Sequence, residues 1–192
     1  MFRMPPLSIS CNRTCPSHRT LALLCLATIA ISARCAAQGT YQSPQDFLRE
    51  AFGGAPPEPS KLWLDENLKA GIRAILEHDL DVLRLRYWGK DGKTAWILEE
   101  IGKERPITTG IVIERGTIER IKVLVFRESR GWEVRYPFFT DQFTGATLGT
   151  GDQLDRGIDG ISGATLSVRA LTRLARLALF LHAHSDFADG KP

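Results

Sequence analysis

The clearest periodic pattern in the sequence lies near its end, where apolar residues recur every three or four positions. They are Leu166, Ala170, Leu171, Leu174, Leu177, Ala178 and Leu181. This spacing predicts a long amphipathic helix, with Arg169, Arg173 and Arg176 on another face. A glycine-rich loop that ends at Gly163 precedes the helix. Glycine lets the backbone turn sharply and approach a ligand closely, so this junction is a candidate binding site.

Helical and alternating patterns also precede that helix. Residues 44–48 predict a short helix, and a second helix is expected to run to about His78, with Ser60 as its N-cap and Trp63 in the core. Further along, apolar and polar residues alternate. This predicts four short strands, at 83–87, 94–98, 107–113 and 118–126. Tight-turn signals containing glycine lie at 90–92 and 114–117. The chain therefore predicts an α+β fold with an antiparallel meander.

The first 37 residues are typical of a secretory signal peptide. A basic stretch with Arg3, Arg13 and Arg19 precedes an apolar run at 21–31, and small residues stand just before Gln38. The run is shorter than the roughly 20 residues that span a bilayer. We expect cleavage after Ala37, followed by a lead-in segment at 38–59, one domain at 60–184 and a C-terminal tail at 185–192. Retention of the leader as an anchor is the alternative.

Loss of the leader changes the composition of the chain. All four cysteines lie in it, so the predicted mature chain has no disulfide, thiolate metal site or cysteine nucleophile. The full chain has 25 basic and 22 acidic residues; the leader holds four arginines and no acid, which leaves 21 − 22 = −1. This balance gives no nucleic-acid footprint. We expect an exported protein, periplasmic or otherwise outside the cytoplasm, which can also associate with a membrane.

Thr165 is expected at or just before the N-terminus of the long helix. Free backbone N–H groups and the positive end of the helix dipole favour a phosphate there, and a hydroxyl at this place can carry a phosphoester. Residues 159–165 fit the pattern Asp-x-x-[Ser/Thr]-Gly-Ala-Thr. This pattern resembles the flavinylation motif of the FMN-binding domain family. That family includes the covalently flavinylated domains of the Na⁺-translocating NADH:quinone reductase and of the Rnf electron-transport complex.

The resemblance implies a twisted antiparallel sheet with flanking helices and FMN bound covalently to Thr165. Asp159 would present the threonine, Gly163 and Ala164 would admit the phosphate, and Ser167 would donate to it. The cofactor-binding residues that it implies in this loop are Asp159, Ser162, Gly163, Ala164, Thr165, Leu166 and Ser167. A second loop, 128–133, fits the family's Glu-Ser-x-Gly-x-Glu pattern, and the resemblance places Glu128, Ser129 and Gly131 beside the flavin ring.

The resemblance also implies partners and a role. A magnesium-dependent flavin transferase would transfer FMN from FAD to the threonine, and a membrane or exported redox protein would exchange electrons with it. The chain would be an electron carrier or electron-transfer subunit rather than an independent enzyme. It would have no catalytic residue and no metal ligand of its own. No nicotinamide-binding fingerprint occurs in the sequence, so direct oxidation of NADH is not expected.

A second copy of the motif complicates the choice of acceptor. Residues 141–147 also fit Asp-x-x-[Ser/Thr]-Gly-Ala-Thr, which makes Thr147 a formal candidate. The residues that follow, 148–152, are poorly suited to a helix, whereas a long helix follows Thr165. The dipole argument therefore favours Thr165, and attachment of flavin at both threonines is the minor alternative.

Two other classes of function fit parts of the sequence. Residues 160–164 nearly match the Gly-x-Ser-x-Gly nucleophile elbow, which would make Ser162 the nucleophile of a hydrolase. Such an enzyme needs an acid and a histidine on later elements of a parallel sheet, but only one helix and a tail follow Ser162. A non-catalytic exported module that keeps the fold without flavin is the other alternative.

The leader yields a direct prediction. The exported protein should begin at Gln38, because the apolar run and the small residues before it form a cleavage signal. N-terminal sequencing of the exported protein measures this. A mature protein that begins at Met1 would contradict it.

Overall fold

The structure is a computed structural model that describes residues 39–188. The predicted leader, its cysteines and the cleavage point after Ala37 lie outside the described residues, as do the last four residues of the predicted tail. Within the described part, no helix is both long enough and apolar enough to cross a membrane.

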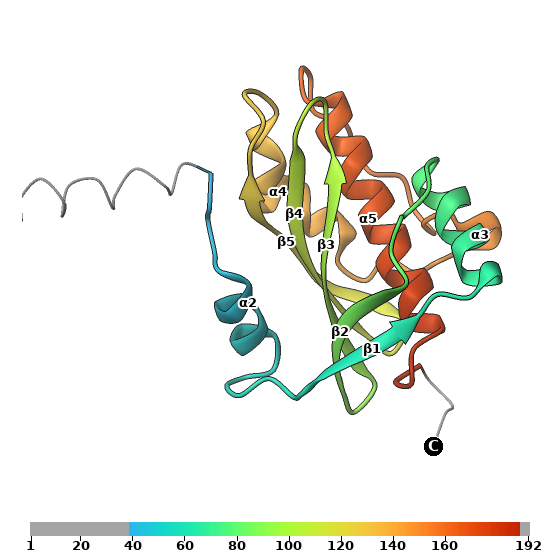
Figure 1. The fold of residues 1–192 in the computed structure, drawn as a ribbon. Helices are drawn as coiled ribbons and strands as arrows, with labels where there is room; N and C mark the ends of the chain where they lie inside the picture. The colour runs from blue at the N-terminus through green and yellow to red at the C-terminus, as the bar shows by residue number, and fades with distance from the viewer. Residues whose placement is uncertain (1–38, 189–192) are drawn as a thin grey trace, which may run out of the picture. The chain divides into compact units, whose positions relative to one another are not determined.

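The core of the domain is one antiparallel sheet in which each strand pairs with the next along the chain (Figure 1). The strands are β1 (Pro59–Trp63), β2 (Arg84–Lys90), β3 (Lys93–Ile101), β4 (Pro106–Glu114) and β5 (Thr117–Phe126). The helices are α2 (Pro44–Ala51), α3 (Glu66–Leu76), α4 (Pro137–Thr140) and α5 (Thr165–Ala183). Short 3₁₀ segments are η1 (Trp132–Arg135), η2 (Asp141–Phe143) and η3 (Thr150–Asp152). The predicted α+β class and the meander are confirmed.

Two hairpin turns account for the close pairing of the long strands. Asp91 and Gly92 join β2 to β3, and Arg115 and Gly116 join β4 to β5; all four have positive φ. Two-residue turns with both φ values positive match the right-handed twist of the strands that they connect. The tight turns predicted from the sequence therefore lie at one end of the sheet, and the β3–β4 turn lies at the other.

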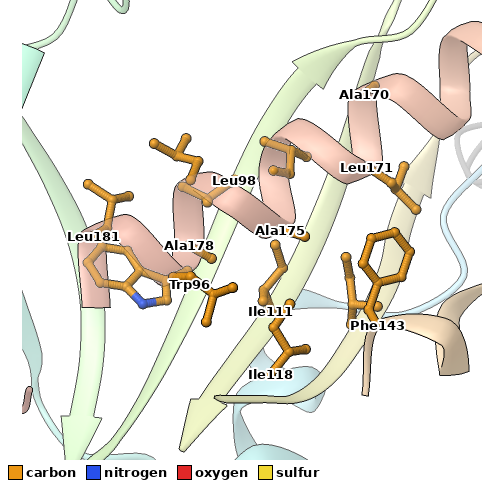
Figure 2. Packing of buried hydrophobic residues seen from close by; sticks show 14 of the residues in the cluster. Trp96, Leu98, Ile111, Ile118, Phe143, Ala170, Leu171, Ala175, Ala178 and Leu181 are labelled. Carbon is orange, nitrogen blue, oxygen red and sulfur yellow. The ribbon is translucent and has the colours of Figure 1, made fainter. Parts of the chain in front are cut away.

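Helix α5 covers one face of the sheet, with α3 beside it (Figure 1). Figure 2 shows its apolar side chains directed at strand residues such as Trp96 and Ile111. Alanines at 170, 175 and 178 let the helix approach the strands closely, while Leu171 and Leu181 fill the space between them. The helix predicted from the periodicity is thus confirmed, and its contact with the sheet fixes its direction.

The other face of the sheet is covered by α2, which belongs to the predicted lead-in. Phe47 and Leu48 are buried against a second apolar cluster that includes Val112 and Leu124. Gly110 makes room for this contact, since a Cβ there would lie 2.6 Å from the Phe47 ring. Glu50 of α2 also pairs with Lys122 of β5. The lead-in therefore packs on the sheet as part of the same compact unit.

The second predicted helix begins later than expected. Ser60 lies in β1 and pairs with Tyr87 of β2, so it is not an N-cap. Asp65 caps α3 instead and accepts a 2.8 Å hydrogen bond from the Leu68 amide. Trp63 is 62% exposed rather than in the core, and the Arg84 guanidinium lies 5.2 Å from its ring. The segment forms a strand because it pairs with the edge of β2. The sequence did not predict this strand because five residues carry little periodic signal.

The histidines near the end of α5 also differ from each other. His184 lies at the exposed end of the helix, but His182 is buried. Its Nδ1 lies 2.8 Å from the Thr94 hydroxyl, and its Nε2 accepts from the Gly116 amide at 3.3 Å. His182 therefore links the end of α5 to the end of the sheet that carries the tight turns.

A contact between His78, just beyond α3, and a buried carboxylate in β3 makes stability depend on pH. His78 contacts the Asp79 carbonyl at 3.0 Å and the buried Glu100 carboxylate at 2.9 Å. These two contacts, that with Asp79 first, raise the pKa of His78 above its ordinary 6.5. Because the folded state binds the proton more tightly, its contribution is fully present below about pH 6.5 and is lost as pH rises through the folded pKa.

We therefore expect wild type to exceed His78→Gln in unfolding free energy by more at about pH 5.5 than at about pH 8.5. Urea unfolding at both pH values measures the two differences. Equal differences would show that the proton on His78 does not contribute.

Candidate functional site

Thr165 is the first residue of α5, and its side chain is exposed. Ala164 occupies the N-cap position, and within residues 39–188 no side chain caps the first turn. The first amides of a helix have no partner in the helix itself, and the dipole adds a partial positive charge there. The start of α5 is therefore open to an anion.

An open pocket of about 600 Å³ lies at this helix end. Its lining comes from three loops and the first turn of α5: Lys103, Glu128, Ser129, Arg130, Gly163, Ala164, Thr165, Leu166 and Ser167. The structure thus brings together most of the residues expected in the two loops, although the loops are far apart in the sequence. It also adds Lys103 and Arg130, which the sequence did not single out. Arg130 stands inside the 128–133 motif and could have been found there; Lys103 lies in a charged turn without any distinguishing pattern.

Three expected residues do not line the pocket. Gly131 lies behind it, in the left-handed region at φ 84°, where a Cβ would be 2.6 Å from the Ser167 hydroxyl. Asp159 and Ser162 are exposed in the loop before α5. The Asp159 amide donates to Gln142 Oε1 at 2.7 Å. The structure therefore places Gly131 and Asp159 as supports of the loops, and no contact assigns a role to Ser162.

Glu128 lies in the pocket wall but is already engaged by the backbone. Its Oε1 accepts from the amides of Lys103, Glu104 and Arg105 at 2.5, 2.6 and 2.9 Å. Burial alone would raise the pKa of Glu128, but these three donors outweigh it and the pKa is lowered. The carboxylate is therefore ionised at neutral pH and holds the β3–β4 turn.

The second motif copy lies in a different setting. The Thr147 amide donates to Asp155 Oδ1 at 3.1 Å, and Thr147 O accepts from the Asp155 amide at 3.0 Å. The Arg156 guanidinium and the Thr147 amide lower the pKa of Asp155 to about 2. The copy is also anchored to Ile118 at the start of β5, whereas the pocket lies beyond the end of that strand. No α-helix follows Thr147 directly, so the physical argument for Thr165 holds.

The geometry does not support a serine hydrolase. The sheet is antiparallel, and the residues just before Ser162 form no strand, so there is no strand–turn–helix elbow. His182 lies 17 residues into α5 from Thr165, which is about 26 Å along a helix. It cannot serve as a base for Ser162 at that distance.

These features define an α+β domain with a pocket at the uncapped N-terminus of a helix. Residues 102–179 match the family model of the FMN-binding domain. The crystal structure of Shewanella oneidensis NqrC has a similar fold, with a TM-score of 0.54 and 14% sequence identity over 74% of this chain and 94% of that chain. Among curated proteins none matches the chain. The resemblance to the FMN-binding domain family is therefore confirmed: residues 102–179 match the family model, the fold is similar to that of NqrC, and the match supports FMN as the cofactor.

Gly131 gives a test of the pocket. Gly131→Ala should lower stability by about 1 kcal/mol because of its positive φ, and should also reduce flavin content because the new methyl group displaces Ser167. Gly116→Ala is the matched control, since Gly116 has φ 73° and no neighbour within 4 Å of its Cβ position. Urea unfolding and flavin absorbance measure the two effects. Equal flavin content in the two variants would exclude crowding of the pocket.

Proposed function

We propose that this protein is an exported electron carrier with FMN attached to the Thr165 hydroxyl by a phosphoester. The observation that carries the proposal is the exposed Thr165 hydroxyl at the uncapped start of α5, a 19-residue helix. This hydroxyl lies in the wall of a pocket that two cationic side chains, Lys103 and Arg130, also line. The FMN-binding family match supports the cofactor. The phosphoester and its position come from the motif at 159–165 and the physical argument.

The residues present fit FMN. A volume of about 600 Å³ lies within the range of small-molecule sites. Lys103 and Arg130 offer positive charge, and the first amides of α5 can donate to a phosphate. A Cβ at Gly163 would meet no described atom within 4 Å, so the backbone just before the helix is open to a ligand. Leu166 provides an exposed apolar surface beside these polar groups.

Attachment of FMN would be the transfer of an FMN group from FAD to Thr165. The Thr165 oxygen forms a bond to the FMN phosphorus, the pyrophosphate bond of FAD breaks, and the hydroxyl proton and AMP leave. The resemblance implies that a separate magnesium-dependent flavin transferase carries out this transfer. A covalent bond suits an exported carrier, since a flavin lost outside the cytoplasm is not easily replaced.

When bound, FMN supplies the electron-transfer chemistry, and the chain holds and orients it. The partner would be a membrane reductase or another exported carrier. The expected leader supports export to the periplasm or another site outside the cytoplasm. The alternative is an exported module of the same fold that carries no flavin. Intact mass of protein from the native host separates the two, because bare polypeptide in the presence of the transferase supports the module.

Thr165→Val should abolish covalent flavin with little effect on folding. Valine keeps the branched shape and removes only the hydroxyl, and the side chain is exposed. Thr147→Val is the matched control and should retain flavin, because no α-helix stabilises a phosphate at Thr147; the helix contribution at Thr165 is about 0.3–2 kcal/mol. In-gel flavin fluorescence after denaturation measures both variants, since only covalent flavin remains.

Each other outcome has a definite meaning. If Thr165→Val still fluoresces and Thr147→Val does not, the first motif copy is the acceptor. If both fluoresce, either threonine can serve, and peptide mapping of the wild type locates the flavin. If the wild type itself carries no flavin in the presence of the transferase, the proposed function is wrong.

A further inference from the structure

A single carboxylate oxygen holds the turn between β3 and β4. Glu128 Oε1 accepts from three successive amides, those of Lys103, Glu104 and Arg105. Successive amides that converge on one point form a concave anion site, and here the anion is a side chain of the same protein. Because Glu128 follows β5, this clamp joins two loops that are 23 to 25 residues apart in the sequence.

The turn fits tightly around that carboxylate. The Gly102 amide donates to Arg105 O at 3.2 Å and closes the turn. A Cβ at Gly102 would lie 3.1 Å from Glu128 Oε1 and 3.1 Å from Ile107 Cδ1, so a side chain there would crowd the clamp. Hydrogen bonds to an ionised carboxylate are stronger than neutral ones. The Glu128 carboxylate, which is not part of the turn, therefore sets the position of the turn.

The resemblance placed Glu128 beside the flavin, and the structure shows that this residue, in the pocket wall, also holds the β3–β4 turn. An ionised carboxylate that faced a bound phosphate would repel it. Three amide donors already satisfy Glu128 Oε1 and compensate its charge. Lys103, in contrast, lines the same pocket as Thr165 and carries the opposite charge. Its Nζ pairs with Glu104 at 3.0 Å, but both side chains are about 70% exposed. Such exposed pairs are weak, so the ammonium can turn to a bound anion at small cost.

We propose that Glu128 is a positioning residue: its carboxylate fixes the β3–β4 turn so that Lys103 lies in the wall of the flavin pocket and contacts the bound FMN. This inference rests on the proposed function, because the group that Lys103 contacts is the flavin. Glu128 acts through Lys103, so its effect on the flavin should depend on the lysine being present.

The clamp itself is tested on protein without flavin. Glu128→Gln keeps the shape of the side chain and removes its charge, so amide hydrogen exchange at Lys103, Glu104 and Arg105 should become about tenfold faster. Glu104→Gln is the control, because it removes a carboxylate from the same turn and leaves the clamp in place. Unchanged exchange in α5 verifies that both variants are folded. Unchanged exchange at the three turn amides of Glu128→Gln would overturn the clamp.

The link to the flavin is tested on protein loaded by the transferase. For each variant, the shift in the thermal unfolding midpoint between unloaded and loaded protein reports the contacts that the flavin makes in the folded state. Lys103→Gln and Glu128→Gln should each reduce this shift. The double variant should lose no more of it than Lys103→Gln alone, because groups that act as a unit are not additive.

The outcomes separate this inference from the proposed function. Additive losses in the double variant would show that Glu128 does not act through Lys103, and an unchanged shift in Lys103→Gln would show that the lysine does not contact the flavin; either result overturns the inference while the flavin remains attached. Wild type that takes up no flavin overturns the proposed function and the flavin contact together, and amide exchange then still decides whether the clamp exists.

Discussion

The packing of α5 against the sheet is the interaction on which the site depends. Its buried leucines and small alanines fix the axis of the helix over β3, β4 and β5. Truncating one buried leucine in such a contact typically costs about 2–5 kcal/mol. Thr165 at one end of this helix meets the pocket loops, while His182 near the other end contacts Thr94 and Gly116. A single helix thereby sets where the hydroxyl, the free amides and the dipole point.

The turns at the two ends of the sheet differ in length and in what they supply to the pocket. At one end, two-residue turns reverse the chain, one with Asp91 and Gly92 and the other with Arg115 and Gly116. At the other end, the β3–β4 turn and the segment after β5 are longer and supply side chains to the pocket. Loops on a rigid sheet can carry binding groups without loss of the core, which explains why the pocket formed at this end.

Charge is distributed so that the pocket favours an anion. Glu128 is the acidic side chain in its lining, and the backbone amides of the β3–β4 turn compensate its charge. Lys103, Arg130 and the start of α5 add positive potential. The second motif copy shows the opposite arrangement, since the Thr147 amide is engaged by Asp155. The same seven-residue pattern thus has different surroundings at its two places in the chain.

The sequence by itself determined the elements whose signals are local. Three signals depend only on neighbouring residues: the apolar period of α5, the tight turns at 90–92 and 114–117, and the motif that ends at Thr165. The predicted class of fold also rested on such local signals. Only the tertiary structure decided the placement of β1, the burial of His182 and the gathering of Lys103 and Arg130 at the pocket. The physical reason is that each of these depends on contacts between distant segments, as in the Glu128 clamp across 25 residues. Periodicity and turn chemistry carry no information about such contacts.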